Sequence, residues 1–216
     1  VDDTNEILSF RTALIVLMVS FAFMVVWLSL SGFSPVTALI FVLIMFIIFL
    51  GVTRVVIEGG VPTLIAPGIA SAQMLSSMGS GAIGPSGLTA MGFTFSYSAD
   101  IRTFVMSAAS NSMKIAERIR QRRRRIFWAM LLAIITALIT TITVSLFISY
   151  RYGGINLSNW YFVAGPQVGF NLAREHILNP QPPNLAGWLN KAIGLVVMGV
   201  FLFMRAKFLW WRLHPI

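Results

Sequence analysis

Residues 36–57 read VTALIFVLIMFIIFLGVTRVVI, and no charged side chain interrupts them before Arg54. An α-helix rises about 1.5 Å per residue, so about 20 apolar residues cross the roughly 30 Å of hydrocarbon in a bilayer. This stretch therefore predicts a transmembrane helix. Three more stretches meet the same requirement, at residues 12–30, 126–149 and 188–204, and a tight turn is expected at residues 31–35.

The composition of the whole chain agrees with this prediction. Of its 216 residues, 57% are hydrophobic and 11% are charged, with a mean hydropathy of +0.82. A soluble domain has about 25% charged residues, so a soluble globular protein is excluded. The chain has no cysteine, which excludes disulfides, thiolate metal sites and cysteine nucleophiles. Its formal net charge is +9, and its sequence pI is about 11.1.

The positions of the basic residues predict the orientation in the membrane. Lysines and arginines gather before the third expected span and after the fourth, whereas the opposite ends of these spans carry few. By the positive-inside rule, the basic segment and the C-terminus are cytoplasmic, and residues 150–187 form an extracytoplasmic loop. We therefore expect a multi-pass protein of the cell inner membrane or plasma membrane. Because both ends of the sequence lack a natural start or stop, a fragment of a longer chain is expected.

Between the second and third spans, residues 59–99 carry no formal charge and are rich in glycine, serine and proline. Their apolar content is too high for a flexible linker. We expect residues 58–99 to form a broken or re-entrant helical hairpin in the membrane, with helices at about Pro62–Met78 and Ser86–Tyr97. The candidate path-lining residues at its break are Gly79, Ser80, Gly81, Gly84 and Pro85. Irregular backbone at membrane depth must be buried in protein or line a cavity. Close packing of small residues is the alternative reading.

Arg54 and Glu58 lie four residues apart on one helical face, near the start of this hairpin. Ionisable groups within a membrane are costly, so the pair is a candidate gate ion pair at the mouth of the path. Because the pair also lies at the end of its span, a salt bridge at the membrane surface explains it equally well.

Residues 98–125 repeat apolar side chains every three or four positions, which predicts an amphipathic helix on the cytoplasmic surface, capped by Ser98. Its end is strongly basic and could bind nucleic acid or anionic lipid. Because this run directly precedes a hydrophobic span, we interpret it as a topology and lipid anchor, and nucleic acid is not expected as a partner. The anchor residues are Arg118, Arg120, Arg122, Arg123, Arg124 and Arg125.

No motif for catalysis is present. The sequence has no H-E-x-x-H, P-loop, dinucleotide-binding or G-x-S-x-G pattern in a suitable setting, and it has few carboxylates. His176 and His214 lack further ligands at metal-binding spacing. We therefore expect no enzymatic activity, no metal site and no cofactor.

Several blocks in the second half of the chain, taken together, resemble a known family. They are Met113-Lys114-Ile115-Ala116-Glu117-Arg118, the following arginine run, Tyr150-Arg151-Tyr152-Gly153 and residues 208–216, FLWWRLHPI. They resemble the C-terminal part of a largely uncharacterised prokaryotic family of multi-pass membrane proteins, similar to oligopeptide-transporter-type permeases. Arg212 departs from the proline usual at that position. The resemblance implies an all-α polytopic protein and, by analogy, a secondary transporter, but it assigns no site residue.

Two hypotheses for function follow from these observations. In the first, the chain is part of a secondary transporter for a small polar or peptide-like solute, with the glycine-rich hairpin lining the path. In the second, it is a non-catalytic structural subunit that packs within a larger membrane complex. The expected partners are the lipid bilayer and either the remaining portion of a parent chain or other membrane subunits.

Overall fold

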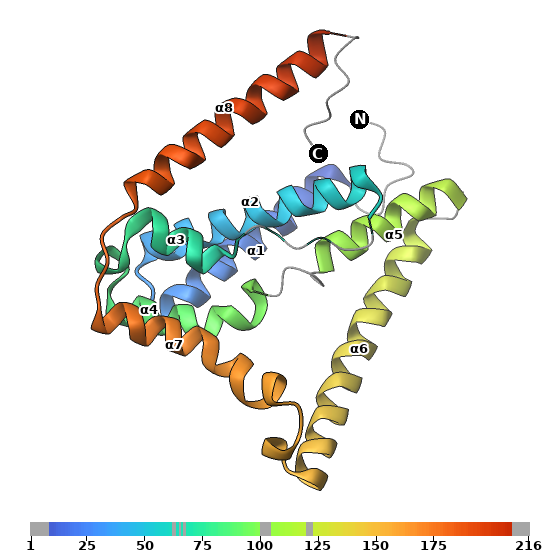
Figure 1. Cartoon of the computed structure of the whole chain (residues 1–216). Helices are drawn as coiled ribbons and strands as arrows, with labels where there is room; N and C mark the ends of the chain where they lie inside the picture. Colours follow the sequence, from blue (N-terminus) through green and yellow to red (C-terminus); the bar gives the residue numbers. More distant parts are fainter. Residues whose placement is uncertain are drawn as a thin grey trace.

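A computed structural model describes residues 9–61, 64, 66, 68–99, 105–119 and 123–208 (Figure 1). These residues form eight α-helices, one 3-10 turn and one π-helical turn, and no strand occurs among them. The prediction of an all-helical chain is confirmed over this part of the sequence. Four of its helices are long and apolar enough to cross a membrane.

The first two of these helices form an antiparallel hairpin. Helix α1 spans Phe10–Leu30 and α2 spans Pro35–Gly59. Each begins at a serine whose hydroxyl accepts a hydrogen bond from a backbone N–H in the first turn, at 3.2 Å for Ser9 and 3.3 Å for Ser34. This is the bond expected of an N-cap. Gly60 ends α2 in the left-handed conformation, with φ 66°.

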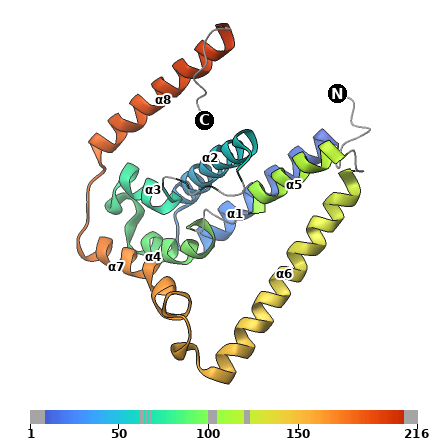
Figure 2. The ribbon, with the colours of Figure 1, turned by 45° about the vertical axis from the view of Figure 1, so that its right-hand side comes forward.

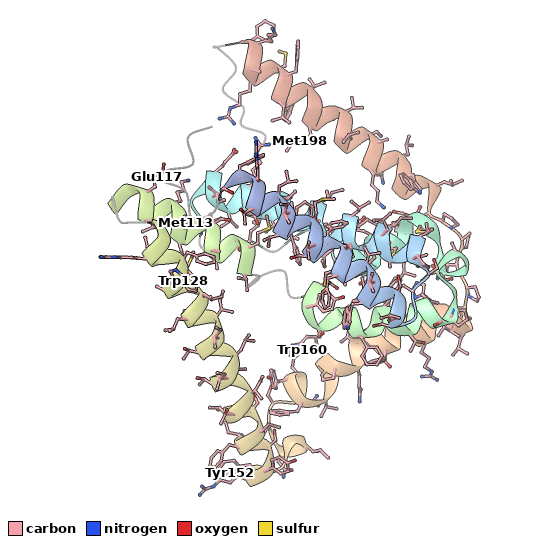
Figure 3. The ribbon with its side chains drawn as sticks, turned by 180° about the vertical axis from the view of Figure 1, so that it is seen from behind. Met113, Glu117, Trp128, Tyr152, Trp160 and Met198 are labelled. Atoms are coloured by element: carbon pink, nitrogen blue, oxygen red, sulfur yellow. The ribbon has the colours of Figure 1, made fainter. Side chains whose placement is uncertain are left out.

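The other two long helices, α6 (Arg123–Tyr152) and α8 (Leu185–Lys207), extend away from this hairpin in two different views (Figures 1 and 2). None of the residues in their most apolar stretches is buried. Figure 3 shows Trp128 and Tyr152 toward the two ends of α6 and Met198 midway along α8. Both helices thus present apolar side chains outward along their length.

The buried core lies among α1, α2 and two shorter helices, α3 (Ala70–Met78) and α4 (Ser80–Ser98). Phe41 of α2 and Met74 of α3 are fully buried in it, together with Leu28 of α1. Helix α3 begins at Ala70, whereas the sequence suggested a helix from about Pro62. Ile69, Gly68 and the other described residues between α2 and α3 are not helical.

The expected amphipathic helix at residues 98–125 differs in the structure. Ser98 is the last residue of α4, so it caps no following helix, and its hydroxyl is buried without a hydrogen-bond partner. Helix α5 spans Val105–Ile119 and packs on α2, where Met106 lies against the cluster formed by Val52, Val56 and Ala66. The basic residues from Arg123 onward belong to α6. Helix α5 therefore binds a buried face of α2.

The region expected to be a loop, residues 150–187, is largely helical. It contains a 3-10 turn, η1 (Gly154–Asn156), and a π-helical turn, η2 (Trp160–Ala164), which continues into α7 (Gly165–Leu178). Helix α7 lies along α4 (Figures 1 and 2). An extended segment, residues 179–184, then joins α7 to α8. This segment reaches the break between α3 and α4.

Candidate functional site

Two glycines interrupt the helix formed by α3 and α4. Gly79 separates the two helices with φ 75° and ψ 161°, and Gly84 has nearly the same conformation, with φ 73° and ψ 164°. Only glycine adopts this conformation readily, because a Cβ would clash with the neighbouring backbone. A short helical stretch from Ser80 to Ile83 lies between them, and Pro85 begins the helix again. The sequence suggested an irregular connection here, whereas the structure has two sharp breaks with helix between them.

The first break is closed by the extended segment that precedes α8. The backbone N–H of Ser80 donates to the carbonyl of Gln181 at 3.0 Å, and the N–H of Gln181 donates to the Ser80 hydroxyl at 2.8 Å. A Cβ on Gly79 would lie 2.8 Å from that same carbonyl and 2.9 Å from the nitrogen of Pro183. Gly79 and Ser80 are consequently buried under residues 179–184.

The C-terminal end of α3 is bound by the start of α8. The indole N–H of Trp188 donates to the carbonyl of Ser77 at 2.9 Å, and the ammonium of Lys191 donates to the Ser77 hydroxyl at 2.7 Å. The N–H of Asn184 donates to the carbonyl of Ser76, also at 2.9 Å. The last carbonyls of a helix carry partial negative charge and lack intrahelical donors. The Trp188 side chain and the Asn184 backbone N–H therefore satisfy two of them from more than 100 positions further along the chain.

The second break, at Gly84, is open on the side where a Cβ would project, unlike the break at Gly79. Gly81 and Pro85 are exposed and Gly84 is half-buried, and a Cβ on Gly81 or Gly84 would meet no atom within 4 Å. Directly after this break, a Cβ on Gly32 in the α1–α2 turn would lie 2.8 Å from the Ser86 hydroxyl. The five residues expected to line a path thus divide into a buried pair, Gly79 and Ser80, and an exposed or half-exposed group of three near the α1–α2 turn.

Helix α7 supports this region through a close crossing with α4. A Cβ on Gly169 would lie 2.6 Å from the carbonyl of Gly92, so the two backbones are in direct contact. Beside this point, the rings of Phe93 and Phe170 meet edge to face with centroids 5.0 Å apart. The sequence interpretation missed α7. Its signal was the small residues Gly165, Gly169 and Ala173, repeated every four positions as in close helix contacts.

Arg54 and Glu58 form an ion pair, with the Arg54 Nε 2.8 Å from the Glu58 Oε1. The structure adds Arg205 of α8, whose Nη1 lies 4.0 Å from the second oxygen of Glu58. Lys114 of α5 also donates from its ammonium to the carbonyl of Ile57. Since Glu58 lies 24 residues after Ser34, the N-cap of α2, about 36 Å separate this cluster from the α1–α2 turn beside Ser86. The structure therefore does not bring the ion pair to the helix breaks.

Only part of the expected arginine anchor is described. Arg120 and Arg122 lie outside the described residues, as do the side chains of Arg118, Arg123 and Arg124, whereas Arg125 is exposed at the start of α6. Within the described ranges, no three His, Asp or Glu side chains gather in a way that could hold a metal ion.

Comparison with known proteins identifies a family for this chain but assigns it no activity. No curated protein matches the chain, and no solved structure matches it. One family of unknown function, DUF6785, matches over residues 1–216. The match covers the entire sequence, including both helix breaks and all four long apolar helices. The chain therefore belongs to the DUF6785 family.

Proposed function

We propose that this chain is part of an integral membrane transporter for a small polar or peptide-like solute, and that it carries out no covalent chemistry. In this proposal the solute passes the exposed side of the second helix break, along Gly81, Gly84 and Pro85. The observation that carries the proposal is the interrupted helix α3–α4, whose first break is sealed by hydrogen bonds to residues 179–184. The resemblance of the sequence to oligopeptide-transporter-type permeases supports the same solute class.

The physics of a bilayer supports a functional reading of the breaks. Non-helical backbone is tolerated at membrane depth only where protein covers it or where it borders a water-filled cavity. Gln181 and Pro183 cover the break at Gly79. Pro85 has no N–H, so Ser86 and Gly87 carry the first N–H groups of the helix that restarts after Gly84. Discontinuous helices of transporters bind the anionic groups of their substrates from this position, and a peptide carboxylate is such a group.

The arrangement of the helix ends supports the proposed orientation. Arg205 near the end of α8 and Lys114 of α5 both lie at the C-terminal end of α2. The α1–α2 turn lies at the other end, beside Ser86. In the proposed topology, the cluster at the end of α2 is cytoplasmic together with the basic segment and the C-terminus, and the breaks lie toward the outer surface.

Uptake by the reconstituted protein tests this proposal. The intact protein in proteoliposomes, with an imposed proton gradient, should accumulate radiolabelled trialanine. Gly81→Leu should lower the initial rate by about tenfold or more, because the added side chain enters open space beside the break without disturbing packing. Gly194→Leu is the matched control, since it places the same side chain in open space on α8. Equal rates for the two variants, or no uptake by the unmodified protein, would refute the proposal.

A structural role within a larger membrane complex is a second candidate. The observation that favours it is the exposure of the apolar stretches of α6 and α8, in which no residue is buried. Large unpartnered apolar surfaces are typical of protein or lipid contacts. Stoichiometric copurification with another membrane polypeptide, combined with an absence of trialanine uptake, would favour this role over transport.

A further inference from the structure

A hollow opens between the C-terminal ends of α2 and α8, at the end of the molecule opposite the helix breaks. It has a volume of about 540 Å³ and is open to the surroundings. Its lining, here called the α2–α8 hollow, consists of Arg54, Glu58, Leu202, Arg205 and Ala206. Three of these five residues are charged and two are apolar. The hollow thus combines a polar mouth with an apolar wall.

The charges of the hollow favour an anion. Two arginines face one glutamate, so the five lining residues carry a net charge of +1. Glu58 accepts from the Nε of Arg54 at 2.8 Å, whereas its 4.0 Å distance to Arg205 is longer than a hydrogen bond. Both arginine side chains remain about half exposed, at 53% and 47%. Their terminal amines can therefore bind a phosphate oxygen, for which guanidinium groups have matching geometry.

Apolar stripes lead away from the hollow on both helices. On α2, Ile47 and Leu50 precede Arg54 at helical spacing, and they are 66% and 43% exposed. On α8, Leu195 and Met198 precede Leu202 in the same way, and all three are exposed. Figure 3 shows Met198 midway along α8. Each stripe continues the lining of the hollow toward the middle of its helix.

Helix α8 contacts the rest of the described chain near both of its ends. Its first turns bind α3 through Trp188 and Lys191, and its last turns approach Glu58 through Arg205. None of its residues is buried. Figures 1 and 2 show the α8 ribbon diverging from α2 toward the C-terminal end of α8. The exposed apolar side chains of α2 and α8 border this separation, and in a membrane another molecule must cover them.

We propose that the α2–α8 hollow binds the phosphate of an anionic phospholipid, whose acyl chains cover the apolar stripes of α2 and α8. This inference rests on the membrane insertion proposed above but not on transport. It assigns Arg54 and Glu58 to a lipid site rather than to a gate. The charged mouth selects an anionic headgroup, and the adjoining stripes select a lipid over a soluble anion. Basic pockets between the cytoplasmic ends of membrane helices bind such headgroups.

Native mass spectrometry of the intact protein in detergent tests this site. The protein is titrated with phosphatidylglycerol, with phosphatidylcholine of the same acyl chains, and with inorganic phosphate. The test variants are Arg54→Gln, Arg205→Gln and the double variant. Lys207→Gln is the matched control, because Lys207 is an exposed cation in the same last turn of α8 but does not line the hollow.

We expect each single arginine variant to weaken phosphatidylglycerol binding roughly fivefold, and the double variant to weaken it roughly thirtyfold. Lys207→Gln should change it less than twofold, and phosphatidylcholine binding should be weak and unaffected by any variant. Equal loss in Lys207→Gln and Arg205→Gln would overturn the site. Competition by inorganic phosphate at the same concentration would overturn the lipid assignment, as would an arginine-dependent dimer in place of bound lipid. A failure of trialanine uptake would leave these results unaffected.

Discussion

Replacing Gly79, Gly84 and Gly81 by alanine, one at a time, separates two contributions to the stability of the interrupted helix, namely backbone conformation and contact with residues 179–184. The same methyl group is added at three positions within six residues, but the surroundings differ. At Gly79 it meets both an unfavourable backbone conformation and the backbone of Gln181 and Pro183. At Gly84 it meets only the unfavourable conformation, and at Gly81 it meets neither.

The structure ranks the three losses of stability. A non-glycine residue in the conformation of Gly79 and Gly84 costs about 1–3 kcal/mol. At Gly79 the methyl group also displaces Gln181, which breaks two hydrogen bonds with Ser80, each worth about 1 kcal/mol. We therefore expect Gly79→Ala to lower the free energy of unfolding by about 3–5 kcal/mol and Gly84→Ala by about 1–3 kcal/mol. Gly81→Ala should raise it by about 0.5–1 kcal/mol, because alanine favours a helix.

Thermal unfolding followed by tryptophan fluorescence in detergent measures the series. Trp188 contacts Ser77 next to the break, so its emission reports on this region. For a chain of this size, 1 kcal/mol shifts Tm by about 2–4 °C, so Gly79→Ala should lower Tm by about 6–20 °C and Gly84→Ala by about 2–12 °C. Gly81→Ala should leave Tm unchanged or slightly raised. Equal Tm values for Gly79→Ala and Gly84→Ala would refute a stabilising contribution of residues 179–184 at the first break, because these two variants share the same backbone strain.

Two further substitutions test the packing of α7 on α4 and the end of α2. Gly169→Ala should lower Tm by several degrees, because its Cβ would lie 2.6 Å from the Gly92 carbonyl, and it should also make residues 153–178 more sensitive to protease. Gly199→Ala is the control, because a Cβ there meets no atom within 4 Å, and equal Tm values for the two variants would contradict the close contact of α4 and α7. Lys114→Met should cost about 0.5–1 kcal/mol of unfolding free energy, because the carbonyl of Ile57 loses its cationic partner. Thermal unfolding of both variants measures these effects, and a Lys114→Met variant as stable as the unmodified chain would exclude the capping role.

The long apolar helices could be predicted from the sequence because hydropathy and length decide them locally. The positions of the helix breaks could also be predicted in part, since Gly79, Gly84 and Pro85 have backbone preferences of their own. The form of the breaks could not be predicted. A run of glycine and serine does not show that Ser80 to Ile83 keep helical conformation, because the bonds to Gln181 that fix this geometry come from a distant segment.

Helix α7 could not be predicted from the hydropathy pattern, for a physical reason. Its C-terminal half carries Arg174, Glu175 and His176, and Pro166 lies near its start, so residues 150–187 resemble a polar loop. What fixes α7 is contact with α4 through backbone at Gly92 and Gly169. Contacts of this kind carry little hydrophobic signal because glycine has no side chain. The approach of Arg205 to Glu58 is likewise a product of the tertiary fold, since these residues belong to helices far apart in the sequence.

The hydrogen bonds between Ser80 and Gln181 can form only late in the synthesis of the chain. The two residues are 101 positions apart. A ribosome that adds about 5–20 residues per second needs roughly 5–20 s to make the intervening segment. During that interval, the Ser80 N–H and hydroxyl lack the Gln181 backbone that they contact in the folded chain. In the proposed membrane topology, the translocation machinery or water therefore covers the open helix break until Gln181 has been added.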